Sequence, residues 1–108
     1  MAGLTTHVLD ITRGIPATGM KVELFSEHEP VKTFWTNAQG RTDAPLLTAE
    51  ELRTGKYELV FHVGDYFAGE GIRFLDRVPI WFGVADVTRH YHVPLSVTPW
   101  AYQTYRGS

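Results

Sequence analysis

Hydrophobic and polar residues alternate along much of this chain, which is the pattern of β-strands with one buried and one exposed face. The most regular stretch places Tyr57, Leu59 and Phe61 on one face and polar residues, His62 among them, on the other. His62 is therefore expected on a solvent-facing surface. The same pattern predicts strands over residues 5–12, 20–26, 31–36, 56–63, 78–84, 90–95 and 98–105.

Turn residues separate these segments at intervals of roughly ten residues, which favours an antiparallel β-sandwich. Helical structure is expected in two short places only. Thr48 and Glu51 have the spacing of a capping box, so one helical turn or a plain turn should form there. The glycine-bounded residues 64–69 have room for one more helical turn. Because the chain contains neither repeats nor a linker, residues 1–108 are expected to form a single domain.

Two histidines alternate with hydrophobic residues near the carboxyl end. Tyr91, Val93 and Leu95 share one strand face, which should point into the core, and this leaves His90 and His92 side by side on the outer face. Exposed histidines are common and need no function. A His-x-His pair can also bind a metal, but no cysteine or nearby carboxylate completes a zinc site. The third interpretation is acid–base catalysis, because imidazole titrates near neutral pH.

Other polar residues are open to a structural or a functional interpretation. His7 lies in the first strand, where a lone histidine is more often structural. Arg41 directly follows a turn, and it is either a surface residue or a planar donor for a carbonyl or an anionic heterocycle. Residues 98–108 are rich in aromatic rings for a chain end. We expect this segment to pack as a strand and to contribute to a site.

Composition excludes several classes of protein. The 108 residues carry 10 basic and 12 acidic side chains, a formal charge of −2, which argues against a nucleic-acid-binding surface. Cysteine is absent, so neither disulfides nor thiolate metal sites are available, in keeping with a reducing compartment. The start does not have the features of a signal peptide, and no apolar run approaches bilayer length. A cytoplasmic protein that does not bind membranes is expected.

Four segments together resemble the 5-hydroxyisourate hydrolase family, the transthyretin-related enzymes of urate breakdown. The segments are LTTHVLD (4–10), TNAQGR (36–41), HYHVPL (90–95) and YRGS (105–108). The resemblance covers essentially the whole chain. Transthyretin itself, the hormone carrier with the same fold, lacks the terminal tetrapeptide and the histidines.

The resemblance implies a transthyretin-like sandwich of two four-stranded sheets, with a short helix over 64–69. It also implies a homotetramer, a dimer of dimers whose active sites open into the channel between dimers. Neither a cofactor nor a metal is implied. The family's catalytic positions fall on His7, Arg41, His92 and Ser108, and Tyr105 joins His7 and Arg41 as a substrate-binding residue. His90 matches the motif in a supporting role.

The implied reaction is hydrolysis of the N1–C6 bond of 5-hydroxyisourate, which gives 2-oxo-4-hydroxy-4-carboxy-5-ureidoimidazoline. His92 or His7 would take a proton from water while the other histidine orients the water or returns the proton. Arg41 would stabilise the developing oxyanion. Ser108 would orient a histidine or the water through its hydroxyl or its terminal carboxylate. Two alternatives compete with the enzyme: a transthyretin-like carrier, which should have an apolar channel, and a purely structural domain, which should tolerate mutation at these positions.

Overall fold

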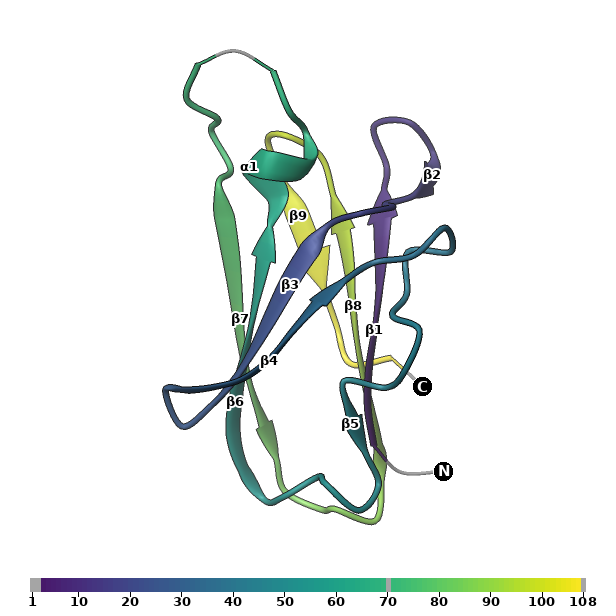
Figure 1. The fold of residues 1–108 in the computed structure, drawn as a ribbon, viewed down its shortest axis with the longest axis vertical. Helices are drawn as coiled ribbons and strands as arrows, with labels where there is room; N and C mark the ends of the chain where they lie inside the picture. The colour runs from purple at the N-terminus through teal and green to yellow at the C-terminus, as the bar shows by residue number, and fades with distance from the viewer. Residues whose placement is uncertain (1–2, 70, 108) are drawn as a thin grey trace.

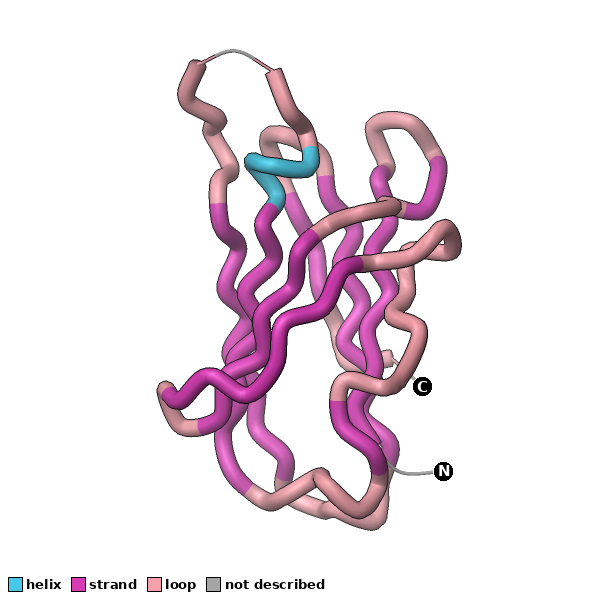
Figure 2. Tube along the Cα trace, in the orientation of Figure 1, coloured by secondary structure: helices cyan, strands magenta, loops and turns pink. Residues whose placement is uncertain are grey.

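The computed structural model describes residues 3–69 and 71–107, which form two β-sheets packed face to face (Figures 1 and 2). The predicted all-β sandwich is therefore confirmed. One sheet has the order β2-β1-β8-β9, with β5 also paired to β1, and the other has the order β4-β3-β6-β7. The strands of the first sheet are β1 (Gly3–Asp10), β2 (Ile15–Pro16), β5 (Leu47–Thr48), β8 (His90–Val97) and β9 (Tyr102–Thr104). Those of the second are β3 (Lys21–Ser26), β4 (Glu29–Trp35), β6 (Gly55–His62) and β7 (Arg77–Val84).

The first sheet departs from the expected arrangement in two respects. It has five strands instead of four, because two-residue strands β2 and β5 both pair with β1. In addition, β1 and β8 run parallel along their whole length, from Gly3 opposite His90 to Asp10 opposite Val97. Alternation along a strand reports which residues share a face but carries no information about the direction of a distant partner. The parallel pair is therefore a feature that tertiary structure adds.

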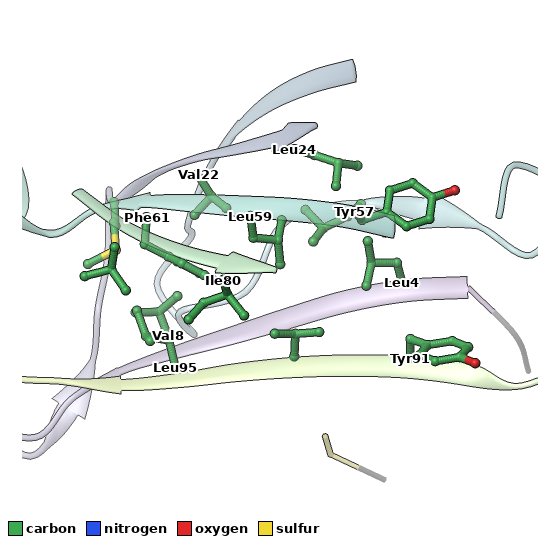
Figure 3. Packing of buried hydrophobic residues seen from close by; sticks show 14 of the residues in the cluster. Leu4, Val8, Val22, Leu24, Tyr57, Leu59, Phe61, Ile80, Tyr91 and Leu95 are labelled. Atoms are coloured by element: carbon green, nitrogen blue, oxygen red, sulfur yellow. The ribbon is translucent and has the colours of Figure 1, made fainter. Parts of the chain in front are cut away.

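The hydrophobic core lies between the two sheets, where side chains from β1 and β8 meet those from β3, β6 and β7 (Figure 3). Leu4 and Val8 of β1 are fully buried. On β8, Tyr91, Val93 and Leu95 are only 5%, 6% and 0% exposed, so the predicted inward face of the histidine strand is correct. Its alternate residues must consequently point to the outer face of the sheet.

A four-residue helix, α1 (Val63–Tyr66), follows β6 at one end of the sandwich, close to the expected 64–69 (Figure 1). The predicted capping box forms as well: the Thr48 N–H donates to Glu51 Oε1 at 2.9 Å, and the Glu51 N–H donates to Thr48 Oγ1 at 3.3 Å. It closes a turn after β5 and not a helix. Within residues 3–69 and 71–107, no helix has the length and apolar character needed to cross a bilayer.

Two predicted strands are shorter than expected because polar side chains close turns next to them. The first stops at Asp10, whose Oδ1 accepts hydrogen bonds from the backbone N–H groups of Thr12 and Arg13 at 3.0 and 3.1 Å. In the segment 98–105 only Tyr102–Thr104 is strand. Residues before it form a turn in which Thr98 Oγ1 accepts from the N–H of Trp100 at 3.0 Å, which leaves Trp100 72% exposed.

The prediction for His62 was wrong, because this side chain is buried and only 6% exposed. Its Nε2 lies 2.5 Å from Glu23 Oε1 on neighbouring β3, and its Nδ1 lies 3.7 Å from Asp65 Oδ2 in α1. The hydrogen bond from His62 lowers the pKa of the Glu23 carboxyl. The alternation of side chains along the strand correctly assigned His62 to the outer face of the sheet. On that face, however, α1 and the carboxylate of Glu23 cover the His62 ring.

Candidate active site

The parallel pairing of β1 with β8 brings three polar side chains together on the outer face of the first sheet. Thr5 lies opposite His92, and Gly3 lies opposite His90. Thr5 Oγ1 lies 2.9 Å from His90 Nε2 and 2.8 Å from His92 Nδ1, so one hydroxyl joins both imidazoles. The ring centroids are 6.4 Å apart and the rings nearly parallel, at 17°. The two histidines therefore form a connected, partly buried group and are not freely solvated.

A pocket of about 450 Å³ opens beside this group. Its walls are Thr5 and Thr6 of β1, His90 and His92 of β8, and residues 41–45. The 41–45 segment belongs to the long connection from β4 to β5, which runs alongside β1 (Figure 1). A guanidinium, a carboxylate, hydroxyls and imidazoles thus converge on one concavity, which is the general character of a site for a polar small molecule.

The turn over residues 37–40 positions Arg41 at this pocket. Asn37 Oδ1 accepts hydrogen bonds from the backbone N–H groups of Gln39 and Arg41 at 2.9 and 3.1 Å, which fixes the turn internally. Gly40 has φ +74°, and its carbonyl accepts from the Val8 N–H of β1 at 2.8 Å. A side chain at Gly40 would collide with the Val8 carbonyl oxygen, so glycine permits the close approach. The turn is therefore anchored to the strand that carries Thr5.

His7 lies beside the pocket, two residues along β1 from Thr5 and on the same face. Within the described part of the chain it is not one of the lining residues. Burial and the positive charge of Arg41 lower the pKa of His7, and a hydrogen bond to the Gln39 backbone opposes them. The ring is therefore held in its neutral form at neutral pH.

The pKa of His92 is lowered in the same way. Burial has the largest effect, and the positive charge of Arg41 adds to it, followed by electrostatic interactions with the neighbouring histidine rings, while hydrogen bonding to the Thr5 backbone opposes the change. His7, Arg41 and His92 are thus close enough to influence one another electrostatically. A neutral imidazole can accept a proton at one nitrogen and donate one at the other, which suits it to acid–base chemistry.

The carboxyl-terminal segment returns across β8 toward the same place. The Gly107 N–H donates to the His92 carbonyl at 2.7 Å, and Gly107 lies so close to the His92 ring that a side chain there would have no room. Ser108 lies outside the described residues. Tyr105 is 61% exposed and lines a separate hollow with residues of β7, including Trp81 and Phe82. Within one chain, therefore, the structure brings His7, Arg41 and His92 together but not Tyr105.

Sequence reasoning did not single out Thr5 or the segment 42–45. Thr5 is two residues from His7 in the same strand, so the two side chains share a face, and this spacing was the available signal that Thr5 lies near the site. Its partner across the sheet is 87 residues away, so its two hydrogen bonds depend on a register that the sequence does not specify. Across residues 3–69 and 71–107, histidine and carboxylate side chains do not gather in a group of three that would hold a metal ion.

Comparison with known proteins relates this geometry to a family. The family model described as "HIUase/Transthyretin family" matches residues 4–107. The chain belongs to this family. A 5-hydroxyisourate hydrolase of Deinococcus radiodurans is 53% identical over an alignment that covers 98% of this chain and 96% of the relative.

Solved structures of the HIUase/Transthyretin family agree with the fold. The structure of Klebsiella pneumoniae 5-hydroxyisourate hydrolase is 39% identical, covers 100% of both chains and has a TM-score of 0.87. Sea bream transthyretin, solved in complex with thyroxine, has a TM-score of 0.88 at 22% identity, with 98% of this chain and 95% of that chain covered. The transthyretin likeness is one of fold alone. The family resemblance drawn from the sequence motifs is thus confirmed.

Proposed function

We propose that this chain hydrolyses 5-hydroxyisourate to 2-oxo-4-hydroxy-4-carboxy-5-ureidoimidazoline in urate catabolism. The chain is an enzyme of the hydrolase class, because curated relatives 48% and 53% identical over nearly its full length are 5-hydroxyisourate hydrolases. The observation that supports the proposed chemistry is the pocket in which Arg41 and His92 converge, with His7 beside it. These are polar groups of the kinds needed to activate water and to stabilise an anion.

The reaction requires a base, an oxyanion partner and a proton donor. As the water oxygen bonds to C6, one of its protons passes to a neutral imidazole, that of His7 or His92. The negative charge that develops on the C6 oxygen is stabilised by Arg41, whose planar fork offers two parallel N–H groups. When the C6–N1 bond breaks, N1 takes up a proton and C6 becomes the new carboxyl group.

Turnover should stay constant through neutral pH and fall only below about pH 6.5, the ordinary pKa of histidine. Burial and Arg41 lower the pKa values of His7 and His92, so both rings remain neutral in more acidic solution than usual. The measurement is the pH dependence of kcat/KM. In an Arg41→Gln variant the nearby positive charge is lost, the histidine pKa values rise, and the acid limb should move to higher pH. An acid limb that does not move would contradict this account.

Ser108 completes the proposed catalytic set, acting through its hydroxyl or its carboxylate on a histidine or on the water. The packing of Gly107 against His92 supports a role for the adjoining residue. A chain that ends at Gly107 should therefore lose much more turnover than thermal stability. The two measurements are kcat/KM and the melting temperature. Unchanged turnover would remove Ser108 from the mechanism.

We further propose that the protein is a cytoplasmic homotetramer, a dimer of dimers. Tyr105 lines a hollow apart from the histidine pocket, so a contact between Tyr105 and substrate in that pocket would have to come from a second copy. Light scattering coupled to size-exclusion chromatography measures the assembly directly. A monomer with full activity would exclude the proposed contribution of Tyr105.

The function is tested by generating 5-hydroxyisourate in place with urate oxidase and following its ultraviolet absorbance. The protein should accelerate the decay of the substrate, and a His92→Ala variant should lose about 10²- to 10⁴-fold of that acceleration if His92 takes part in acid–base catalysis. If the wild-type protein leaves the spontaneous rate unchanged, the hydrolase proposal fails for this substrate. The alternative would then be a carrier of the transthyretin type, which the polar lining of this pocket disfavours.

A further inference from the structure

The hydroxyl of Thr5 bridges the two histidines, and this restricts which nitrogen of each ring carries a proton. A hydroxyl has one hydrogen, so it can donate to only one of two partners and must accept from the other. Thr5 Oγ1 is 2.9 Å from His90 Nε2 and 2.8 Å from His92 Nδ1. A neutral imidazole carries one N–H, on either Nδ1 or Nε2, so the hydroxyl limits how the protons of the two rings can be arranged.

Two arrangements satisfy both hydrogen bonds. In the first, His92 donates from Nδ1 to Thr5, Thr5 donates to His90 Nε2, and the proton of His90 resides on Nδ1. In the second, His90 donates from Nε2 to Thr5, and Thr5 donates to His92 Nδ1. His92 then carries its proton on Nε2, and His90 Nδ1 is a bare acceptor.

The surroundings of His90 distinguish the two arrangements. His90 Nδ1 is buried and has no hydrogen-bond partner among the described residues. The first arrangement would leave a buried N–H without an acceptor, whereas the second leaves only an unfilled lone pair. Buried N–H groups without a partner are rarer in proteins than under-satisfied acceptors. The Thr5 carbonyl near the His92 ring favours a proton on Nδ1, but that arrangement requires the buried orphan N–H on His90.

We propose that Thr5 is a positioning residue, which together with His90 holds His92 as the neutral tautomer protonated at Nε2. This inference rests on the proposed hydrolase function and assigns the two histidines within it. His92 is engaged at Nδ1, so Nε2–H is the group that it offers to the substrate. His92 then serves as a hydrogen-bond donor to the C6 oxygen beside Arg41, and His7 is the base.

The assignment keeps the proton balance of the reaction. A neutral imidazole that gave up its Nε2 proton would become an anion, so His92 donates a hydrogen bond without transferring the proton. His7 takes the proton from water as the C6–O bond forms and returns it to N1 as the C6–N1 bond breaks. Each histidine therefore ends the cycle in the state in which it began.

The tautomers can be observed without substrate, by long-range ¹H–¹⁵N correlation spectra of the ¹⁵N-labelled protein at mildly alkaline pH. Both His90 and His92 should carry their protons on Nε2. A Thr5→Ser variant should preserve this state, because it retains the hydroxyl. A Thr5→Val variant should lose it at His92, because valine has the same shape and no donor. A His92 ring protonated at Nδ1 in the wild-type protein would overturn the inference.

Kinetics provide the second readout. Thr5→Val should lower kcat about tenfold, the equivalent of one hydrogen bond, and Thr5→Ser should restore most of the loss. Thr33→Val on β4 is the matched control, since Thr33 is an exposed strand residue of the other sheet. Equal rates in Thr5→Val and wild type would refute the positioning role. If the wild-type protein shows no hydrolase activity, the proposed function fails, and the spectra still decide the tautomer independently.

Discussion

Replacing His7 by alanine should lower kcat/KM for 5-hydroxyisourate about 10²- to 10⁴-fold, the usual contribution of one acid–base group. His7 is on the same strand face as Thr5, and its pKa is lowered by burial and by Arg41, so the ring is neutral and able to accept a proton. The assignment of His92 as a hydrogen-bond donor leaves His7 as the base. The loss should therefore appear in kcat, with little change in KM.

Two observations would separate a catalytic effect of His7→Ala from a structural one. The melting temperature should change little, because His7 lies on the outer face of β1 and not in the core. His28→Ala is the matched control, since His28 is exposed in the turn between β3 and β4. It should retain wild-type turnover. If His7→Ala also retained wild-type turnover, the base would have to be another group. The Nε2-protonated form of His92 would then no longer identify His7 as the base.

Exchanging Arg41 for lysine should lower kcat/KM about 10²- to 10³-fold, as the loss of an oxyanion partner does in other enzymes. Lysine preserves the positive charge but presents a single ammonium group in place of the planar fork. The turn anchored by Asn37 and Gly40 holds residue 41 at the pocket whichever side chain it carries. The substitution therefore tests the geometry of donation separately from charge.

The pH profile of Arg41→Lys sharpens that test. Because a positive charge remains, the acid limb should stay close to its wild-type position, unlike that of Arg41→Gln. Arg77→Lys is the matched control, since Arg77 is exposed at the start of β7 in the opposite sheet. It should not affect turnover. Full activity in Arg41→Lys would mean that charge alone suffices and that two parallel hydrogen bonds are not required.

Several local features were predictable because they depend on residues near one another in the chain. Alternation placed Tyr91, Val93 and Leu95 in the core and the two histidines on the outer face. The turn at 37–40 was recognisable from its asparagine and glycine, and Arg41 follows this turn directly. The family motifs led to the same positions. The burial of His62 was not predictable, since α1 and a carboxylate from another strand cover it.

The sequence by itself determined the faces of the strands, the turns and the family, because side-chain periodicity and turn chemistry act over a few residues. Only the tertiary structure decided that β8 runs parallel to β1 and in which register. That register brings Thr5 within hydrogen-bonding distance of two rings 85 and 87 residues away. A contact over such a separation depends on how the whole core closes, and in the proposed arrangement the direction of a single hydroxyl hydrogen then determines which nitrogen of His92 carries the proton.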